Sequence, residues 1–130
     1  MPIDHRIDHT RRLVIAEGRG EVTEQDIFGY QREVWSRPEV TGYHELVDMS
    51  GIKSMPTPEA GRMRELAILA AGTDVPHPGA RLAIVANNDL AYGLAQMYAA
   101  YRSVNPQSTK RVEVFRSLDE ALRWLVPKTP

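Results

Sequence analysis

The chain has 130 residues, of which 42% are hydrophobic and 25% charged, enough for one compact domain with a sizeable core. Sixteen Lys and Arg against 17 Asp and Glu leave a formal net charge of -1 without an acidic or basic tail, which argues against a nucleic-acid or membrane-binding surface. The absence of Cys excludes disulfides, thiolate nucleophiles and cysteine-type metal sites. We therefore expect a single domain over residues 1–130 that has no cofactor.

The N-terminal residues lack the apolar segment of a secretory signal. No run of the sequence approaches the roughly 18 apolar residues that a membrane-spanning helix needs. A cytoplasmic protein without a membrane span is the expectation.

The N-terminal part of the chain predicts two strands. Ile3, His5 and Ile7 alternate with charged residues, and an apolar run occupies 13–16 after a turn at His9 and Thr10. Gly18 and Gly20 close the second strand.

A helix and a third strand come next. Thr23 followed by Asp26 resembles a capping box, and apolar residues then recur at helical spacing. We expect a helix over about 24–36, stopped before Pro38, and a strand over 43–48.

The second helix and the fourth strand occupy the middle of the chain. Thr57 offers a hydroxyl cap and Pro58 occupies the first turn of a helix that runs to Gly72. The segment 82–86 is a continuous apolar run, typical of a strand covered by helices on both faces. We expect this fourth strand to lie at the centre of the sheet.

The C-terminal part predicts a helix, a strand and a last helix. Asn88 or Asp89 caps the third helix, 112–115 is the fifth strand, and Ser117 opens a capping box at the fourth helix. Helical spacing predicts the inward-facing residues: Leu90, Leu94, Met97, Tyr98 and Tyr101 in the third helix, and Leu118, Ala121, Leu122 and Leu125 in the fourth. Trp124 and Leu125 should fix the fourth helix to the sheet.

The order of elements is therefore ββαβαβαβα. Such alternation predicts an α/β fold, with one mixed five-stranded sheet, right-handed crossovers and four helices on its two faces.

Two segments resemble a known family. The sequence LVDMSGIKSM at 46–55 is similar to the strand-to-loop stretch of STAS domains, the fold of SpoIIAA-type anti-sigma-factor antagonists. The sequence VFRSLDEALRWL at 114–125 resembles the ending of the SpoIIAA-like (STAS/SEC14) family of small bacterial proteins. The order of strands and helices agrees from residue 3 to 125. The resemblance implies a mixed five-stranded sheet with four helices, in a family whose members mostly have no assigned activity.

The chain departs from the family at its phosphorylation site. STAS antagonists carry Asp-Ser-Ser-Gly or a close variant at the start of the second helix, where a partner kinase phosphorylates one Ser. Here the stretch reads PTPE at 56–59, so Pro58 stands at the phosphoacceptor position and Glu59 replaces the Gly. Thr57 is the adjacent hydroxyl and is expected to cap the helix, so we expect no phosphorylation switch.

Polar side chains gather where the predicted parallel strands end and helices begin. Ligands of open α/β sheets bind outside the carboxyl ends of the strands. The candidate ligand or partner surface consists of Asp48, Ser50, Thr57, Asn87, Asn88 and Tyr92. The alternative is a local role, in which hydroxyls and amides cap their own helices and Asp48 binds backbone N–H groups.

No catalytic, metal or dinucleotide motif is complete. The four histidines lack metal-ligand spacing on any predicted helix. Ser50 is not in a G-x-S-x-G elbow, and the run from Gly18 to Gly20 has Thr23 where a third Gly is required. We expect neither a metal site nor enzyme activity.

The third helix carries an aromatic set with two interpretations. Met97, Tyr98 and Tyr101 either line a groove for a lipid or small hydrophobic ligand or simply pack in the core. Tyr92 lies off this stripe and should border the polar surface.

Two functional hypotheses follow. The first is a non-enzymatic regulatory or interaction module that docks a protein partner through 50–63. The second is a small-ligand domain, or an unrecognised enzyme, that binds an anion or hydrophobic acid at the carboxyl edge of the sheet. A homodimer is also expected, because the first strand should lie near a sheet edge and Met55, Met63 and several Ala of the second helix could form an apolar patch.

Overall fold

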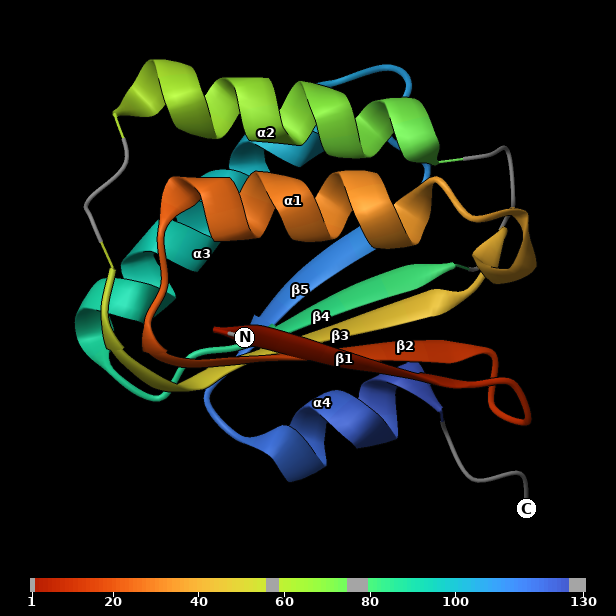
Figure 1. Ribbon diagram of the computed structural model, residues 1–130, viewed down its shortest axis with the longest axis horizontal. Helices are drawn as coiled ribbons and strands as arrows, with labels where there is room; N and C mark the ends of the chain where they lie inside the picture. Colours follow the sequence, from red (N-terminus) through yellow and green to blue (C-terminus); the bar gives the residue numbers. More distant parts are fainter. Residues whose placement is uncertain (1, 56–58, 75–79, 127–130) are drawn as a thin grey trace.

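In a computed structural model the chain forms one mixed sheet between two helical layers (Figure 1). The structure describes residues 2–55, 59–74 and 80–126. The strands are β1 (Ile3–Asp8), β2 (Leu13–Glu21), β3 (His44–Ser54), β4 (Arg81–Val85) and β5 (Arg111–Phe115). The helices are α1 (Glu24–Trp35), the short 3-10 helix η1 (Pro38–Val40), α2 (Ala60–Thr73), α3 (Asp89–Ser103) and α4 (Leu118–Leu125). The predicted α/β class and order of elements are confirmed.

The strands lie in the order in which they occur in the chain, β1-β2-β3-β4-β5. β1 is antiparallel to β2 and occupies an edge, as expected, whereas the other pairs are parallel. The prediction that the fourth strand is central is wrong, because β3 holds that place. β4 is apolar throughout because Ala83 and Val85 pack towards α4 while Leu82 and Ile84 pack towards α3. A continuous apolar run therefore indicates that helices cover both faces of the strand, and it does not indicate where the strand lies within the sheet.

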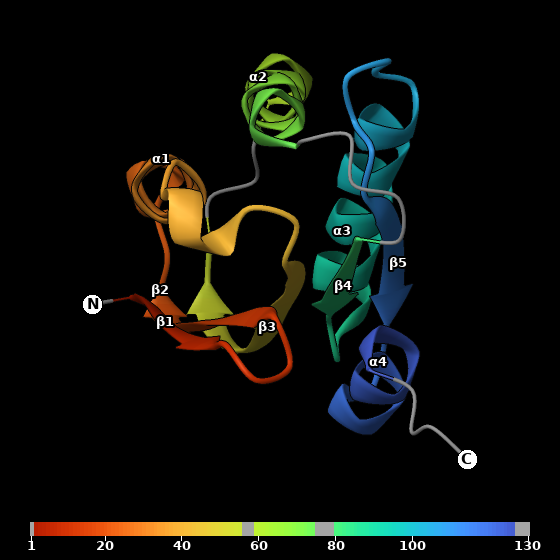
Figure 2. The same cartoon turned by 90° about the vertical axis from the view of Figure 1, so that its right-hand side faces the viewer.

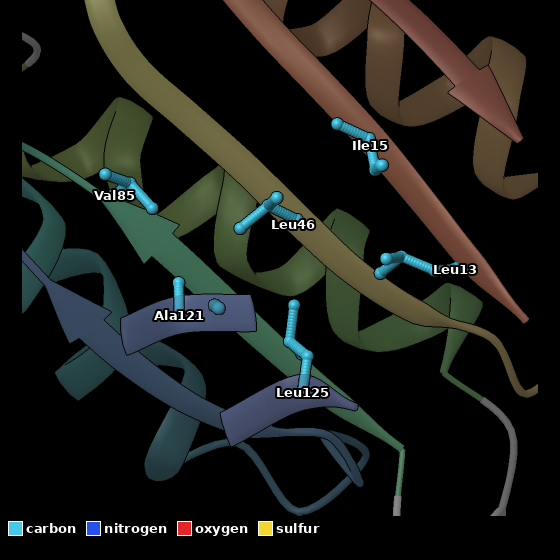
Figure 3. Close-up of a cluster of buried hydrophobic side chains, with 7 residues drawn as sticks. Leu13, Ile15, Leu46, Val85, Ala121 and Leu125 are labelled. Atoms are coloured by element: carbon cyan, nitrogen blue, oxygen red, sulfur yellow. The ribbon is translucent and has the colours of Figure 1, made fainter. Parts of the chain in front are cut away.

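α1, α2 and α3 lie on one side of the sheet and α4 lies on the other (Figures 1 and 2). α4 lies on β3, β4 and β5, where it closes a single buried cluster, most of which is shown in Figure 3. This cluster consists of Leu13, Ile15, Leu46, Ala83, Val85, Ala121 and Leu125. Of the described helices, none has the length and apolar character that crossing a bilayer requires.

The opposite face has two separate clusters. One groups Val14 with Val34, Trp35, Val40 and Tyr43 under α1 and η1. The other groups Leu82, Ile84 and Ala95 under α3. α2 packs mainly on α1 and α3 rather than on the strands, and Figure 2 shows it as the outermost element of this layer. The sheet surface between the two clusters is therefore not filled directly by a helix.

Most predicted helix ends are confirmed. Thr23 and Asp26 form a reciprocal capping box at α1, the Asn88 side chain accepts from Ala91 N at α3, and Ser117 accepts from Glu120 N at α4. The second helix is different: α2 begins at Ala60, and Glu59, without a side-chain cap bond, holds the N-cap position predicted for Thr57. Thr57 and Pro58 themselves lie outside the described residues.

Several residues predicted to face inward are exposed. Leu90 is 65% exposed, Met97 45% and Leu118 42%, whereas Tyr98 of the predicted α3 stripe packs against the cluster of Leu82, Ile84 and Ala95 as expected. The buried residues of α3 are Ala95 and Arg102. In α4 the buried residues are Ala121 and Leu125, as predicted.

Candidate functional site

A pocket of about 160 Å³ lies between β3 and the three helices of the upper layer. It occupies the space between the two separate clusters of this face. Its apolar walls come from the sheet (Ala16, Val47, Met49, Ile52, Leu82, Ile84), from α1 (Ile27, Phe28), from α2 (Met63, Leu66) and from α3 (Leu94, Ala95). The pocket follows β3 from buried Glu45 to half-buried Met55.

The length of β3 determines the outer end of the pocket. The strand extends six residues beyond the predicted end at Asp48, because its last part pairs with β2 across two register shifts after β4 has ended. Gly18 of β2 has no side chain, and a Cβ there would lie 2.7 Å from Ile52 Cδ1. Ile52 therefore packs directly over the Gly18 backbone and forms the wall of the pocket at this end.

Three methionines line the pocket: Met49, Met55 and Met63. Methionine is unbranched and polarisable, so it adapts its shape to different apolar contents. This finding also corrects a prediction. Met63 and the apolar alanines Ala67, Ala70 and Ala71 of α2 are buried within the fold, so they do not supply the exposed patch that the homodimer hypothesis assumed.

Arg62 joins α2 to α1 beside the pocket. Its guanidinium lies 4.5 Å from the centre of the Phe28 ring, and its Nε donates to Glu24 Oε2 at 3.1 Å. It also pairs with Glu65 one turn along α2. Arg62 is thus already paired with two carboxylates.

The inner end of the pocket is polar. Glu45, which is 4% exposed, accepts from the Tyr30 hydroxyl at 2.8 Å and from Trp35 Nε1 at 3.0 Å. Its other oxygen accepts from Lys110 Nζ at 3.2 Å. Lys110 lies 3.3 Å from the Trp35 ring centre.

Burial shifts the ionisation of this cluster. The pKa of Tyr30 lies well above its ordinary value because burial and the Glu45 charge both oppose phenolate formation. The pKa of Lys110 is lowered because burial penalises the ammonium, although Glu45 opposes that effect. The cluster is therefore held together by a buried ion pair with neutral aromatic partners.

A second buried ion pair lies behind Tyr98. Arg102 donates to Asp74 at 2.7 Å and to the Tyr98 hydroxyl at 3.0 Å. Asp74 Oδ2 also accepts from the backbone N–H groups of Thr109 and Lys110 at 2.9 and 3.2 Å. Asp74 directly follows α2, so this pair ties the end of α2 to α3 and to the start of β5.

The predicted carboxyl-edge surface has mainly local roles. Asp48 Oδ1 accepts from Ser50 N at 2.9 Å, and Asn88 Oδ1 accepts from Ala91 N at 2.9 Å, which confirms the local alternative for these two residues. Asn87 is exposed. Thr57 lies outside the described residues.

Tyr92 is engaged with its neighbours on the same edge. Arg116 lies 4.0 Å from the centre of its ring and pairs with Asp89, while the Tyr92 hydroxyl accepts from Gln96. Of the candidate residues that the structure describes, Asp48 alone contributes to the pocket wall.

Histidines take structural hydrogen bonds. His44 Nδ1 accepts from the Arg81 backbone at 3.1 Å, and His9 Nδ1 bonds with the Tyr43 hydroxyl at 2.7 Å. The described part of the chain holds no group of three or more side chains suited to a metal ion.

The inner end of the pocket was not found from the sequence. A Glu within an apolar strand is a weak signal, and its partner Lys110 is 65 positions away. No spacing rule connects the two residues.

The comparisons with known proteins agree with this architecture. No protein-family model matches the chain, and no curated protein matches it. Among solved structures, the chain is similar to an uncharacterised protein of the DUF3478 family with a SpoIIAA-like fold from Shewanella loihica. The two are 15% identical over 95% of this chain and 93% of that chain, with a TM-score of 0.60. The chain has a SpoIIAA-like α/β fold.

Proposed function

We propose that this SpoIIAA-like domain is a non-enzymatic module that binds a small apolar molecule in the pocket over β3. The pocket itself is the observation that carries the proposal. Protein interiors leave few voids larger than a water molecule. An apolar cavity of about 150 Å³ is large enough to bind benzene.

The wall composition supports binding rather than catalysis. Among the described residues that line the pocket there is no Ser, Thr, Lys or His, so this part of the wall holds no hydroxyl nucleophile paired with a histidine or lysine base. The buried carboxylate, Glu45, already accepts from three donors. An apolar ligand needs no hydrogen bond from Glu45, so these three bonds can remain when it binds.

A titration followed on the methionine methyl groups by NMR tests the proposal with toluene as the probe. Met49, Met55 and Met63 line the pocket, whereas Met97 is exposed on α3 and serves as the internal reference. We expect saturable shifts of the three pocket methyls and none at Met97.

A matched pair of variants gives the control. Ala95→Leu fills the pocket, and Ala100→Leu places the same side chain on the exposed side of the same helix. Toluene should lose its effect in the first variant and keep it in the second. Equal responses in both variants, or no shift of the pocket methyls up to the solubility of toluene, would refute the proposal.

A second candidate function is self-association. Leu90, Met97 and Val104 are exposed at seven-residue spacing along α3, so an antiparallel contact with a second copy would place Leu90 opposite Val104 around Met97. Sedimentation equilibrium of the protein and of Met97→Glu tests it: a dimer that the substitution dissociates is expected, and a monomer at high micromolar concentration would refute it.

A further inference from the structure

We infer that the pocket selects neutral, compact ring molecules that carry at most one hydrogen-bond donor, and that it rejects organic acids of the same size. This inference rests on the proposed function and specifies its ligand. Three observations carry it: the cationic side chains at the pocket are already paired with protein carboxylates, one amide oxygen accepts no hydrogen bond from the described residues, and the volume is small.

The charge at the inner end is balanced inside the protein. Glu45 and Lys110 form an ion pair whose side chains are 5% and 6% exposed. Tyr30 and Trp35 occupy the Glu45 oxygen that faces away from Lys110. A ligand cation would compete with Lys110 for a carboxylate that is already neutralised, and a ligand anion would enter beside that carboxylate, so both are penalised by desolvation.

The second ion pair is balanced in the same way. Arg102 and Asp74 are almost fully buried and bonded to each other. The Tyr98 hydroxyl accepts from Arg102, so its polar group is directed at the ion pair although its side chain belongs to the pocket wall. Tyr98 therefore presents mainly its ring to a ligand.

The cationic residue nearer the outer end is also paired. Arg62 is shared between Glu24 and Glu65, and the Asp48 carboxylate accepts from the Ser50 backbone. A ligand carboxylate would have to displace two protein carboxylates from Arg62. The described wall thus offers no free cationic side chain to a ligand anion.

Gln31 provides an uncharged acceptor in the wall. The Thr73 hydroxyl donates to Ala70 O at 2.8 Å, so it accepts from Gln31 Nε2 at 3.0 Å. This arrangement fixes the orientation of the Gln31 amide. Its Oε1 accepts no hydrogen bond from the described residues, and Gln31 lines the pocket. A phenol-type O–H or an indole-type N–H can donate to it.

The volume limits the ligand to a small ring system. Pockets that enclose drug-sized ligands measure about 300–1,000 Å³, whereas this one measures about 160 Å³. A ring molecule of about six to ten non-hydrogen atoms fits, by comparison with the benzene-sized cavity of about 150 Å³. A long acyl chain exceeds the available space.

Four probes of matched ring size test the inference on the full chain: toluene, phenol, benzoate and benzylamine. Their dissociation constants are measured from the methyl shifts of Met49, Met55 and Met63, with Met97 as reference. We expect toluene and phenol to bind, and benzoate to bind at least about tenfold more weakly at pH 7. Benzylamine is the reference cation for the charge variants described next. Gln31→Leu should remove any preference for phenol over toluene and leave toluene binding intact.

Two charge variants sharpen the test. Lys110→Met leaves Glu45 without its ammonium and should shift the preference towards benzylamine over benzoate, whereas Glu45→Gln should shift it towards benzoate. Far-UV circular dichroism shows whether each variant is folded. If a variant is not folded, the dissociation constants of the four probes for the wild-type protein decide whether the inference holds. Wild-type binding of benzoate as tight as that of toluene would overturn the inference and leave the pocket proposal standing. A lack of response to all four probes would overturn both.

Discussion

The two faces of the sheet are built in opposite ways. The α4 face has one continuous cluster of aliphatic residues (Figure 3), in which Leu125 is only 2% exposed. The opposite face has two clusters, a pocket between them and two buried ion pairs. The face with a single helix is thus the continuously packed one.

The difference follows from where the helices lie. α4 rests directly on β3, β4 and β5, so its side chains fill the surface of the sheet. α2 packs on two other helices and cannot fill the surface of β3 beneath it. Direct contact of a helix with the strands, rather than the number of covering helices, therefore accounts for the difference in packing between the two faces.

The largest effect is expected at the ion pair of the pocket face. Lys110→Met should lower the free energy of unfolding by about 3–5 kcal/mol, because it leaves Glu45 charged and buried without its partner. The double variant Glu45→Leu with Lys110→Met should lose much less, since it leaves no unpaired charge. Urea unfolding of both variants measures this. Equal losses in the single and double variants would mean that the pair does not act as a unit.

Truncation on the α4 face comes next. Leu125→Ala should cost about 2–5 kcal/mol, because it opens a cavity in a continuous cluster. Leu118→Ala on the same helix is the matched control and should stay within about 0.5 kcal/mol, since Leu118 is exposed. Denaturant unfolding curves give both values. A loss below about 0.5 kcal/mol for Leu125→Ala would contradict the role assigned to this residue.

Enlarging a buried alanine compares the two faces directly. Ala121→Leu on α4 should cost about 1–3 kcal/mol through overpacking, because Ala121 is fully buried in the continuous cluster. Ala95→Leu on α3 should cost less than about 0.5 kcal/mol, or stabilise the protein, because the new side chain enters the pocket. Thermal and urea unfolding test the contrast. Comparable losses at the two positions would show that the faces are packed alike.

The smallest effect concerns pH. The pKa of His44 lies below its ordinary value of 6.5, mainly because burial penalises the imidazolium, with repulsion from Arg81, Lys110 and Arg12 added. The unfolded chain therefore takes up a proton more readily than the folded one, so the free energy of unfolding should fall as the pH drops below 6.5. His44→Asn keeps an acceptor for the Arg81 backbone and should flatten this slope between pH 7 and 5. Identical slopes in urea unfolding of the two proteins would rule out His44 as the source.

Local sequence patterns were sufficient to predict the fold class, the order of strands and helices, and most helix ends. Capping residues such as Thr23, Asn88 and Ser117 act on backbone groups only a few positions away, so local patterns are sufficient to predict them. Ala121 and Leu125 were also predictable as buried, since helical spacing places them on one face.

The tertiary structure alone decided the position of β3, the side of α3 that faces the sheet, and the pocket. Each depends on contacts between distant parts of the chain, such as Lys110 with Glu45 and Gln31 with Thr73. The local sequence around Glu45 shows only a charged residue within a strand. Its burial is stabilised by Tyr30 and Trp35 of α1 and by Lys110 next to β5. A void has no sequence pattern of its own, because it exists only where packed elements fail to meet.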